Sequence, residues 1–290
     1  MTVHKVNRQG KDALFTLIFG EHPENALSLY NAINKTNYTN VEDLEITTLK
    51  DAVYIGIKND VSFLFNSDMN LYEHQSTYCP NMPLRGLGYF ANLYEVHLGG
   101  EELSRFRMYD RTLLKVPAPK YYVFYNGEEK QPEEIELRFS DAYEGEGDIE
   151  IVAHMINVNK GYSNELMSHC KPLSDYSEFF YRLREYNKQG YTKEEAAELV
   201  IDSCIKDGIL ESLLRKERAK VTSSLITALT EKEIEQLRKY QLERANREGL
   251  EQRGFEDIDK LIASGLADVE KACEVLGVSL EDYRRYKETN

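Results

Sequence analysis

The sequence lacks an apolar run long enough for a membrane span, and its few cysteines form no recognisable framework. No segment approaches the roughly 18 to 20 consecutive apolar residues of a transmembrane helix, and the start, MTVHKVNRQGKD, has no apolar stretch typical of a secretory signal. The four cysteines are far apart and show neither a disulfide pattern nor a CxxC metal motif: Cys79, Cys170, Cys204 and Cys273. We therefore expect a cytoplasmic protein with reduced, buried thiols and no membrane association.

An excess of positive charge is also absent. The chain has 36 basic and 50 acidic residues, which gives a formal net charge of −14. This sign opposes binding of nucleic acid through a broad basic surface. An acidic site is, however, what a hard divalent cation requires. Any affinity for DNA should therefore be local, weak and strongly dependent on salt.

The first half of the chain alternates between helical and strand patterns. Apolar residues three and four positions apart, on both sides of residues 20–24, predict two short helices within residues 11–34. Residues 45–77 are rich in β-branched and aromatic residues, with turn signals at Lys58-Asn59 and Asn66-Ser67-Asp68, and predict a meander of three strands.

Beyond Pro80 and Pro83 the pattern predicts a helix over residues 84–98 that stops at Gly99-Gly100. Two further strands are expected, over residues 120–127 and over residues 149–159, the latter with a bend or bulge. The order of helix, meander, helix, strand and strand indicates a mixed α/β fold.

From residue 175 onward the strand signals disappear. Thr192 and Glu195 form a capping-box pattern that opens an amphipathic helix ending near Gly208, and Thr230 and Glu233 repeat it. Residues 211–254 are dense in Arg, Lys and Glu, which predicts long, largely solvated helices suited to pairing with another chain. Residues 255–290 predict three short helices broken at Gly265 and Gly277. The expected division is a core over 1–175, a charged helical extension over 176–254 and a small helical appendage over 255–290.

Residues 59–75, NDVSFLFNSDMNLYEHQ, hold the candidate chemistry. In a hairpin that closes near Ser67 and Asp68, antiparallel pairing puts Asp60 opposite Gln75 and Ser62 opposite Glu73. Side chains alternate along a strand, so Asp60, Glu73 and Gln75 share one face. Two carboxylates and an amide oxygen are the hard ligands that Mg²⁺ prefers, and a bound metal can activate water for hydrolysis of a phosphodiester. The same spacing also occurs on an ordinary polar sheet face.

Several segments together resemble the PD-(D/E)XK nuclease family transposases, also called the Rpn family of recombination-promoting nucleases. The similarity spans roughly residues 8–220. It is carried, in the family's order, by KDALFTLIFG, LYNAINKTNYTNVEDLEI, YIGIKNDVSFLF, LYEHQST, NMPLRGLGYFANLY, PKYYVFYNG and HCKPLSDYSEF. The resemblance implies a restriction-endonuclease-like PD-(D/E)XK core, a mixed sheet flanked by helices, with an α-helical C-terminal extension. It also implies a metal-dependent DNA endonuclease.

The resemblance also implies site residues. In that family the strand pair carries an Asp and then Glu-x-Gln or Glu-x-Lys, which correspond here to Asp60, Glu73 and Gln75. Asp60 and Glu73 would be the ligands of Mg²⁺, or of Mn²⁺. Gln75 stands where the wider superfamily has a lysine, and a neutral amide can orient or ligate but not supply charge. Asp12, in the family-like KD-x-x-F segment, is a candidate fourth residue, although an acidic residue also favours a helix N-terminus.

The sequence also predicts the orientation or contacts of other residues near this motif. His74 should face away from Glu73 and Gln75, toward the core or an interface. Arg85 can face a phosphate or pair with Glu73. Gly86 and Gly88 lack the rest of a phosphate-binding motif and are expected to let a helix pack closely on the sheet.

Three accounts of function remain open at this point. The first is a Mg²⁺-dependent DNA endonuclease linked to recombination or transposition, expected to act as a homo-oligomer such as a dimer. The second is a catalytically weak or inactive protein that keeps the fold as an oligomerising module, which Gln75 and the net charge favour. The third is a regulator whose terminal helices bind DNA, although they offer only Arg284, Arg285 and Lys287 as a basic cluster.

Overall fold

The computed structural model describes residues 9–48, 59–227, 254–260, 262–263, 268–276 and 279–289. It divides the chain into two compact units, residues 1–228 and 229–290. In the second unit, α10 (Val269–Leu276) and α11 (Leu280–Thr289) pack around the buried residues Ile258, Ala272, Cys273 and Tyr283. Residues 254–260 and 262–263 are helical as well, so helix is found in each of the three segments expected in residues 255–290. Among the described helices, none combines the length and apolar character needed to cross a membrane.

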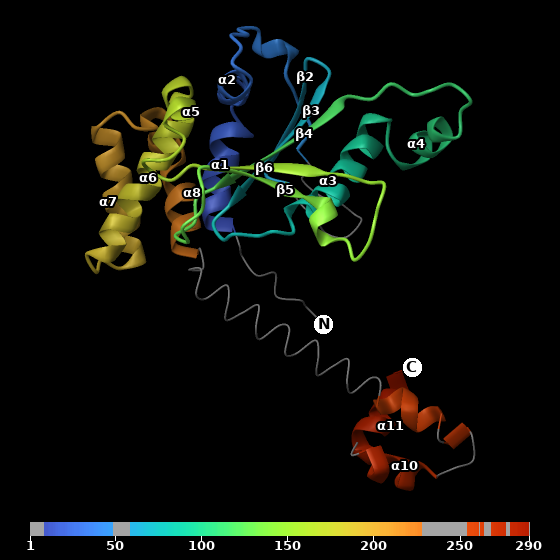
Figure 1. Cartoon of the computed structure of the whole chain (residues 1–290). Coiled ribbons are helices and arrows are strands. Elements are labelled where there is room, and N and C mark those ends of the chain that lie inside the picture. Colours follow the sequence, from blue (N-terminus) through green and yellow to red (C-terminus); the bar gives the residue numbers. More distant parts are fainter. Residues whose placement is uncertain are drawn as a thin grey trace. The chain divides into compact units, whose positions relative to one another are not determined.

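A six-stranded mixed sheet forms the centre of the first unit (Figure 1). Its spatial order is β1-β2-β3-β4-β6-β5. The strands are β1 (Glu45–Ile46), β2 (Val61–Phe65), β3 (Asp68–Gln75), β4 (Ala118–Tyr125), β5 (Glu134–Arg138) and β6 (Val152–Asn157). β1, β2 and β3 are antiparallel neighbours, whereas β4 is parallel to both β3 and β6. The expected meander and mixed α/β class are confirmed, while residues 49–58, within the segment predicted to form the meander, lie outside the described residues.

Helices cover both faces of this sheet. On one face lie α1 (Gln9–Phe19), α2 (Pro23–Asn34), α5 (Asn164–His169), α6 (Lys171–Lys188), α7 (Lys193–Lys206) and α8 (Glu211–Thr227). Their apolar side chains form one core with Val61, Phe63, Tyr72 and Phe124 of the sheet. On the other face α3 (Met82–His97) forms a second core with Leu71, Val123 and Met155. The two periodic segments 11–34 and 84–98 are therefore helices, as predicted.

Local signals explain where several elements begin and end. The Thr192 hydroxyl oxygen accepts a hydrogen bond from the backbone N–H of Glu195, and the Glu195 carboxylate accepts one from the backbone N–H of Thr192, which is the predicted capping box. After α3, Gly99 and Gly100 adopt φ values of +104° and +85°, which glycine tolerates, and the short helix α4 (Glu101–Met108) follows. The cysteines are free thiols, three of them buried and Cys79 half-buried.

The described part of the charged segment differs from the expectation of solvated helices. α8 buries Leu213, Leu214, Val221 and Leu225 in the core that it shares with α1 and α7. The sequence did not indicate this apolar face, because the many charged residues between the leucines and valine obscure the helical period. Residues 228–253, including the predicted cap at Thr230 and Glu233, lie outside the described residues.

Candidate carboxylate site on the β2–β3 hairpin

The carboxylates of Asp60 and Glu73 both accept backbone hydrogen bonds where β2 begins and β3 ends. The backbone N–H of Asp60 donates to Glu73 Oε1 at 2.9 Å, and the backbone N–H of His74 donates to Asp60 Oδ2 at 2.7 Å. Each carboxylate is thus held by the backbone of the opposite strand. This reciprocal arrangement fixes both groups at one end of the sheet, and their role as metal ligands stays a prediction.

The register that brings them together differs from the predicted one. Val61 pairs with Tyr72 and Ser62 with Leu71, so Ser62 does not lie opposite Glu73, and continuing this register places Asp60 beside Glu73, not Gln75. The reason is the turn: Asn66 and Ser67, with φ values of +51° and +64°, form a two-residue loop between Phe65 and Asp68. The predicted register was wrong by two residues. Because a two-residue shift preserves the alternation of faces, the predicted grouping of Asp60 with Glu73 is unaffected.

Two side chains of α3 complete the surroundings of Glu73. Glu73 is 1% exposed, and its Oε2 accepts hydrogen bonds from Arg85 Nη2 at 2.9 Å and from the Tyr89 hydroxyl at 3.0 Å. Of the two predicted alternatives for Arg85, the ion pair with Glu73 is therefore the one found. Arg85 and Tyr89 are four residues apart, so both project from the same side of the helix.

The electrostatics of this cluster are those of a buried ion pair. Burial opposes the charge on Arg85, but the Glu73 carboxylate and Tyr89 outweigh it and raise the pKa of Arg85. Burial, followed by the negative charge of Glu73, raises the pKa of Tyr89 well above its usual value, so Tyr89 stays a neutral donor. Sequence reasoning missed Tyr89, although its spacing from Arg85 was a usable signal.

The other predicted site residues have different surroundings. Gln75 ends β3, is half-buried, and its backbone oxygen accepts a hydrogen bond from the backbone N–H of Asn126. His74 faces the opposite core, as predicted, with its ring near those of Phe15 and Tyr176. The backbone of Asp12 belongs to α1, but its side chain lies outside the described residues, so its predicted role remains a prediction.

The donor types at this site suit a hard cation, although the chain's own arginine competes for one of them. Magnesium is commonly held by one or two protein carboxylates, with water and substrate phosphate supplying the other ligands. Asp60 and Glu73 match that number. Within the described residues, no set of three His, Cys, Asp or Glu side chains is arranged to hold a metal, and Arg85 lies against Glu73 Oε2. A metal at that oxygen would have to replace the guanidinium.

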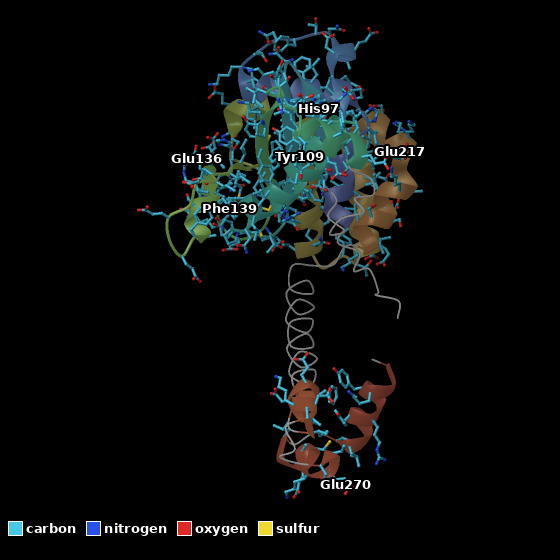
Figure 2. The ribbon with its side chains drawn as sticks, turned by 90° about the vertical axis from the view of Figure 1, so that its right-hand side faces the viewer. His97, Tyr109, Glu136, Phe139, Glu217 and Glu270 are labelled. Carbon is cyan, nitrogen blue, oxygen red and sulfur yellow. The ribbon has the colours of Figure 1, made fainter. Side chains whose placement is uncertain are left out.

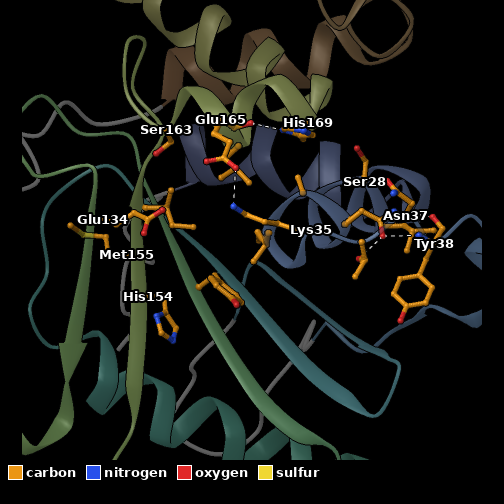
Figure 3. A pocket seen from close by; sticks show the side chains of 18 of the residues that line it. Ser28, Lys35, Asn37, Tyr38, Glu134, His154, Met155, Ser163, Glu165 and His169 are labelled. Carbon is orange, nitrogen blue, oxygen red and sulfur yellow. Dashed lines mark hydrogen bonds and ion pairs between the residues drawn. The ribbon is translucent and has the colours of Figure 1, made fainter.

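A cavity of about 1010 Å³ lies elsewhere, between the β5–β6 edge of the sheet and helices α2 and α5 (Figure 3). Neither Asp60 nor Glu73 lines it. Its acidic lining residues are Glu24, Glu133, Glu134, Glu136 and Glu165. The one lysine there, Lys35, forms an ion pair with Glu165. Such a lining repels phosphate, so this cavity does not suit nucleic acid.

The terminal helices offer little positive charge for a phosphate backbone. Lys287, one of the three basic residues noted there, forms an ion pair with Asp259 at 3.1 Å. This pairing weakens the account of a DNA-binding regulator built on the second unit.

No family model, curated protein or solved structure matches this chain. The resemblance to the nuclease family therefore rests on the sequence segments quoted above, and the carboxylate site rests on its own geometry.

Proposed function

We propose that this protein is a metal-dependent DNA endonuclease with a PD-(D/E)XK-type core, acting in recombination or transposition. The observation that carries the proposal is that the carboxylates of Asp60 and Glu73 each accept a hydrogen bond from the backbone of the opposite strand, at the same end of the β2–β3 pair. The order of the family-like segments along the chain supports the same function.

Mg²⁺, or Mn²⁺ in its place, would be held by Asp60 and Glu73. When bound, the metal would polarise the phosphodiester and lower the pKa of a water molecule. Without metal, a carboxylate as buried as Glu73 needs another cation, and Arg85 supplies it. Exchange of the guanidinium for the metal keeps the charge of Glu73 compensated in both states.

The chain's own residues have separate roles in this proposal. The backbone N–H groups of Asp60 and His74 hold the two carboxylates in place. Arg85, once released from Glu73, becomes a donor for a phosphate oxygen of the substrate. Gln75, as a neutral amide, orients a ligand or water without adding positive charge, which predicts slower cleavage than a lysine would give.

A second candidate function is supported by the same cluster. Glu73 is almost fully buried and already has a cationic partner, so the site is stable as a purely structural ion pair. In that case the fold would act as a binding or oligomerising module without catalysis. The two candidates differ in one property, the requirement for a divalent metal.

Plasmid cleavage decides between them. Supercoiled DNA is incubated with the full chain in Mg²⁺, Mn²⁺ or EDTA, beside Asp60→Asn and Glu73→Gln, which preserve shape and most hydrogen bonds. The matched control is Glu136→Gln, which alters an exposed carboxylate on β5. We expect metal-dependent nicking by the wild type and the control, and a loss of about 100-fold or more in both site variants, comparable to removing a key electrostatic group.

Metal binding gives an independent readout. Mg²⁺ should raise the melting temperature of the wild type but not of Asp60→Asn, because a ligand that binds only the folded state stabilises it. If the wild type neither cuts DNA nor responds to either metal, the endonuclease proposal is wrong and the binding-module account stands.

A further inference from the structure

A basic and aromatic surface lies at the other end of α3 from Arg85, on a chain that is otherwise strongly acidic. Residues 103–116, LSRFRMYDRTLLKV, contain four basic residues and one acidic residue, whereas the whole chain has a net charge of −14. We call the exposed side chains of this segment the α4 surface. Its described members are Leu103, Phe106, Arg107, Met108, Tyr109, Asp110, Arg111, Thr112, Leu113, Lys115 and Val116.

The large apolar and aromatic residues of the α4 surface are far more exposed than their size would predict. Phe106 is 76% exposed, Tyr109 88% and Leu113 78%. Figure 2, which turns this side of the molecule toward the viewer, shows Tyr109 on the near face. Large apolar side chains are seldom left in water in such a group unless they contact a partner.

The cationic side chains beside them have no partner within the described residues. Arg107, Arg111 and Lys115 are exposed and take part in no ion pair there, unlike Arg138, Arg182 and Arg218 elsewhere on the chain. Asp110 is committed to a local turn, since its carboxylate accepts a hydrogen bond from the backbone N–H of Thr112. Acidic residues are nearby in sequence at Glu95, Glu101 and Glu102, but precede this segment.

We infer that the α4 surface binds single-stranded DNA, with Phe106 and Tyr109 stacking on bases and Arg107, Arg111 and Lys115 contacting phosphates. Exposed aromatic faces set among cations are what sequence-tolerant single-strand binding requires. A second copy of this chain is a poorer partner for the surface, because two copies that each carry a charge of −14 repel one another. A polyanion, in contrast, is attracted to the unpaired cations of this surface.

The position of this surface fits the proposed endonuclease, on which the inference rests for its substrate. Arg85 lies near the start of α3 and the α4 surface follows its end, a separation of roughly 18 Å along the helix axis. Single-strand sites of this kind cover roughly 4 to 16 nucleotides, enough to span that distance. A strand held on Phe106 and Tyr109 can therefore reach the carboxylate site from outside it.

Binding is measured by fluorescence anisotropy with a labelled thymidine oligonucleotide, in EDTA so that cleavage plays no part. We expect the full chain to bind the single strand better than the same sequence as a duplex. Phe106→Ala/Tyr109→Ala should weaken binding by about tenfold for each ring lost. Both side chains are exposed, so the fold should persist, which the thermal melt checks. The matched control, Tyr191→Ala, removes a half-exposed ring from the loop between α6 and α7.

The charges are tested by salt dependence. Arg107→Gln/Arg111→Gln/Lys115→Gln should lower the slope of log Kd against log salt by about 2, because each phosphate contact to a single strand contributes about 0.7. Its control is Arg215→Gln/Lys216→Gln/Lys220→Gln, which removes three exposed charges from α8 and makes the chain equally more acidic. Equal losses in both triple variants would mean that net charge, not this surface, governs binding.

Two further outcomes overturn the inference. One is wild-type protein that binds no oligonucleotide, or α4-surface variants that bind as tightly as the controls. The other is a change from dimer to monomer in Phe106→Ala/Tyr109→Ala with DNA binding intact, which would make the surface an interface between copies. If Asp60→Asn still binds the oligonucleotide but no longer cleaves DNA, both proposals are supported. If the wild type binds the oligonucleotide but never cleaves DNA, only the endonuclease proposal is contradicted and the binding surface is retained.

Discussion

Arg85 and Glu73 face each other between α3 and β3, with guanidinium Nη2 2.9 Å from carboxylate Oε2. The Glu73 side chain is 1% exposed and that of Arg85 37%. The acidic partner is therefore the one that depends on the pair, because its charge has almost no access to water. The arginine retains a route to solvent, which allows it to leave when a metal arrives.

Replacement of Arg85 should destabilise the fold. We expect Arg85→Met to lower the free energy of unfolding by about 3 kcal/mol, since it leaves a buried carboxylate without its cation. The double variant Glu73→Gln/Arg85→Met should recover much of the loss, because the unpaired charge is gone. Urea unfolding measures both, with Arg138→Met as the control: its pair with Glu136 is exposed and worth less than about 1 kcal/mol. A loss in Arg85→Met no greater than in this control would contradict the prediction.

The same variant tests the exchange of arginine for metal. Mg²⁺ should raise the melting temperature of Arg85→Met by more than that of the wild type, because the metal no longer competes with a guanidinium for Glu73. A smaller or equal shift in the variant would show that Arg85 does not compete.

Buried tyrosines should make the protein sensitive to alkali. Burial is the main cause that raises the pKa of Tyr72, Tyr89 and Tyr121 above the ordinary value of 10.0. The folded state then keeps protons that the unfolded state loses, so stability is fully present below pH 10 and declines as pH rises above it. Tyrosinate absorbance should show these groups titrating only with unfolding. Tyr89→Phe should flatten this decline, whereas titration of all tyrosines before the loss of helical circular dichroism would be inconsistent with their burial.

Gly86 sets the approach of α3 to the sheet. A Cβ added there would lie 2.6 Å from Tyr121 Cε1, closer than such contacts occur, so the ring or the helix must move. We expect Gly86→Ala to cost about 1 to 2 kcal/mol, because the overlap outweighs the alanine's better helix propensity. Gly145→Ala is the control, since a Cβ there meets nothing within 4 Å. Comparable melting temperatures for the two variants would argue against this tight packing.

The sequence was informative where a local signal dominates. The capping box at Thr192, the glycine stop after α3 and the orientation of His74 away from Glu73 all follow from neighbours a few residues away, and all are confirmed. For Arg85 the sequence left two alternatives, a phosphate or Glu73. It could not choose between them, because only tertiary packing places α3 against Glu73.

Elements that contradict the usual patterns were missed. β5 is a short edge strand whose outward residues are charged, Glu134, Glu136 and Arg138, so its sequence has the polarity of a loop. α4 leaves Phe106 in water, which inverts the expected relation between apolarity and burial. The hairpin register depended on whether Asn66-Ser67 or Ser67-Asp68 formed the turn, and both pairs suit one.

That turn supports the last prediction. Ser67 has a φ of +64°, a conformation that costs an L-residue roughly 1 kcal/mol and glycine almost nothing. Ser67→Gly relieves this cost but makes the unfolded chain more flexible, so we expect a net stabilisation of about 0.5 kcal/mol. Ser67→Val should destabilise the protein by more than about 1 kcal/mol, because a β-branched residue is strained at this φ. Ser76→Gly, at a residue without positive φ beyond the end of β3, should not stabilise the protein.

Because this turn sets the register that places Asp60 beside Glu73, Ser67→Val should also weaken metal-dependent cleavage more than its stability loss explains. Unchanged cleavage in a folded Ser67→Val variant would separate the turn from the site.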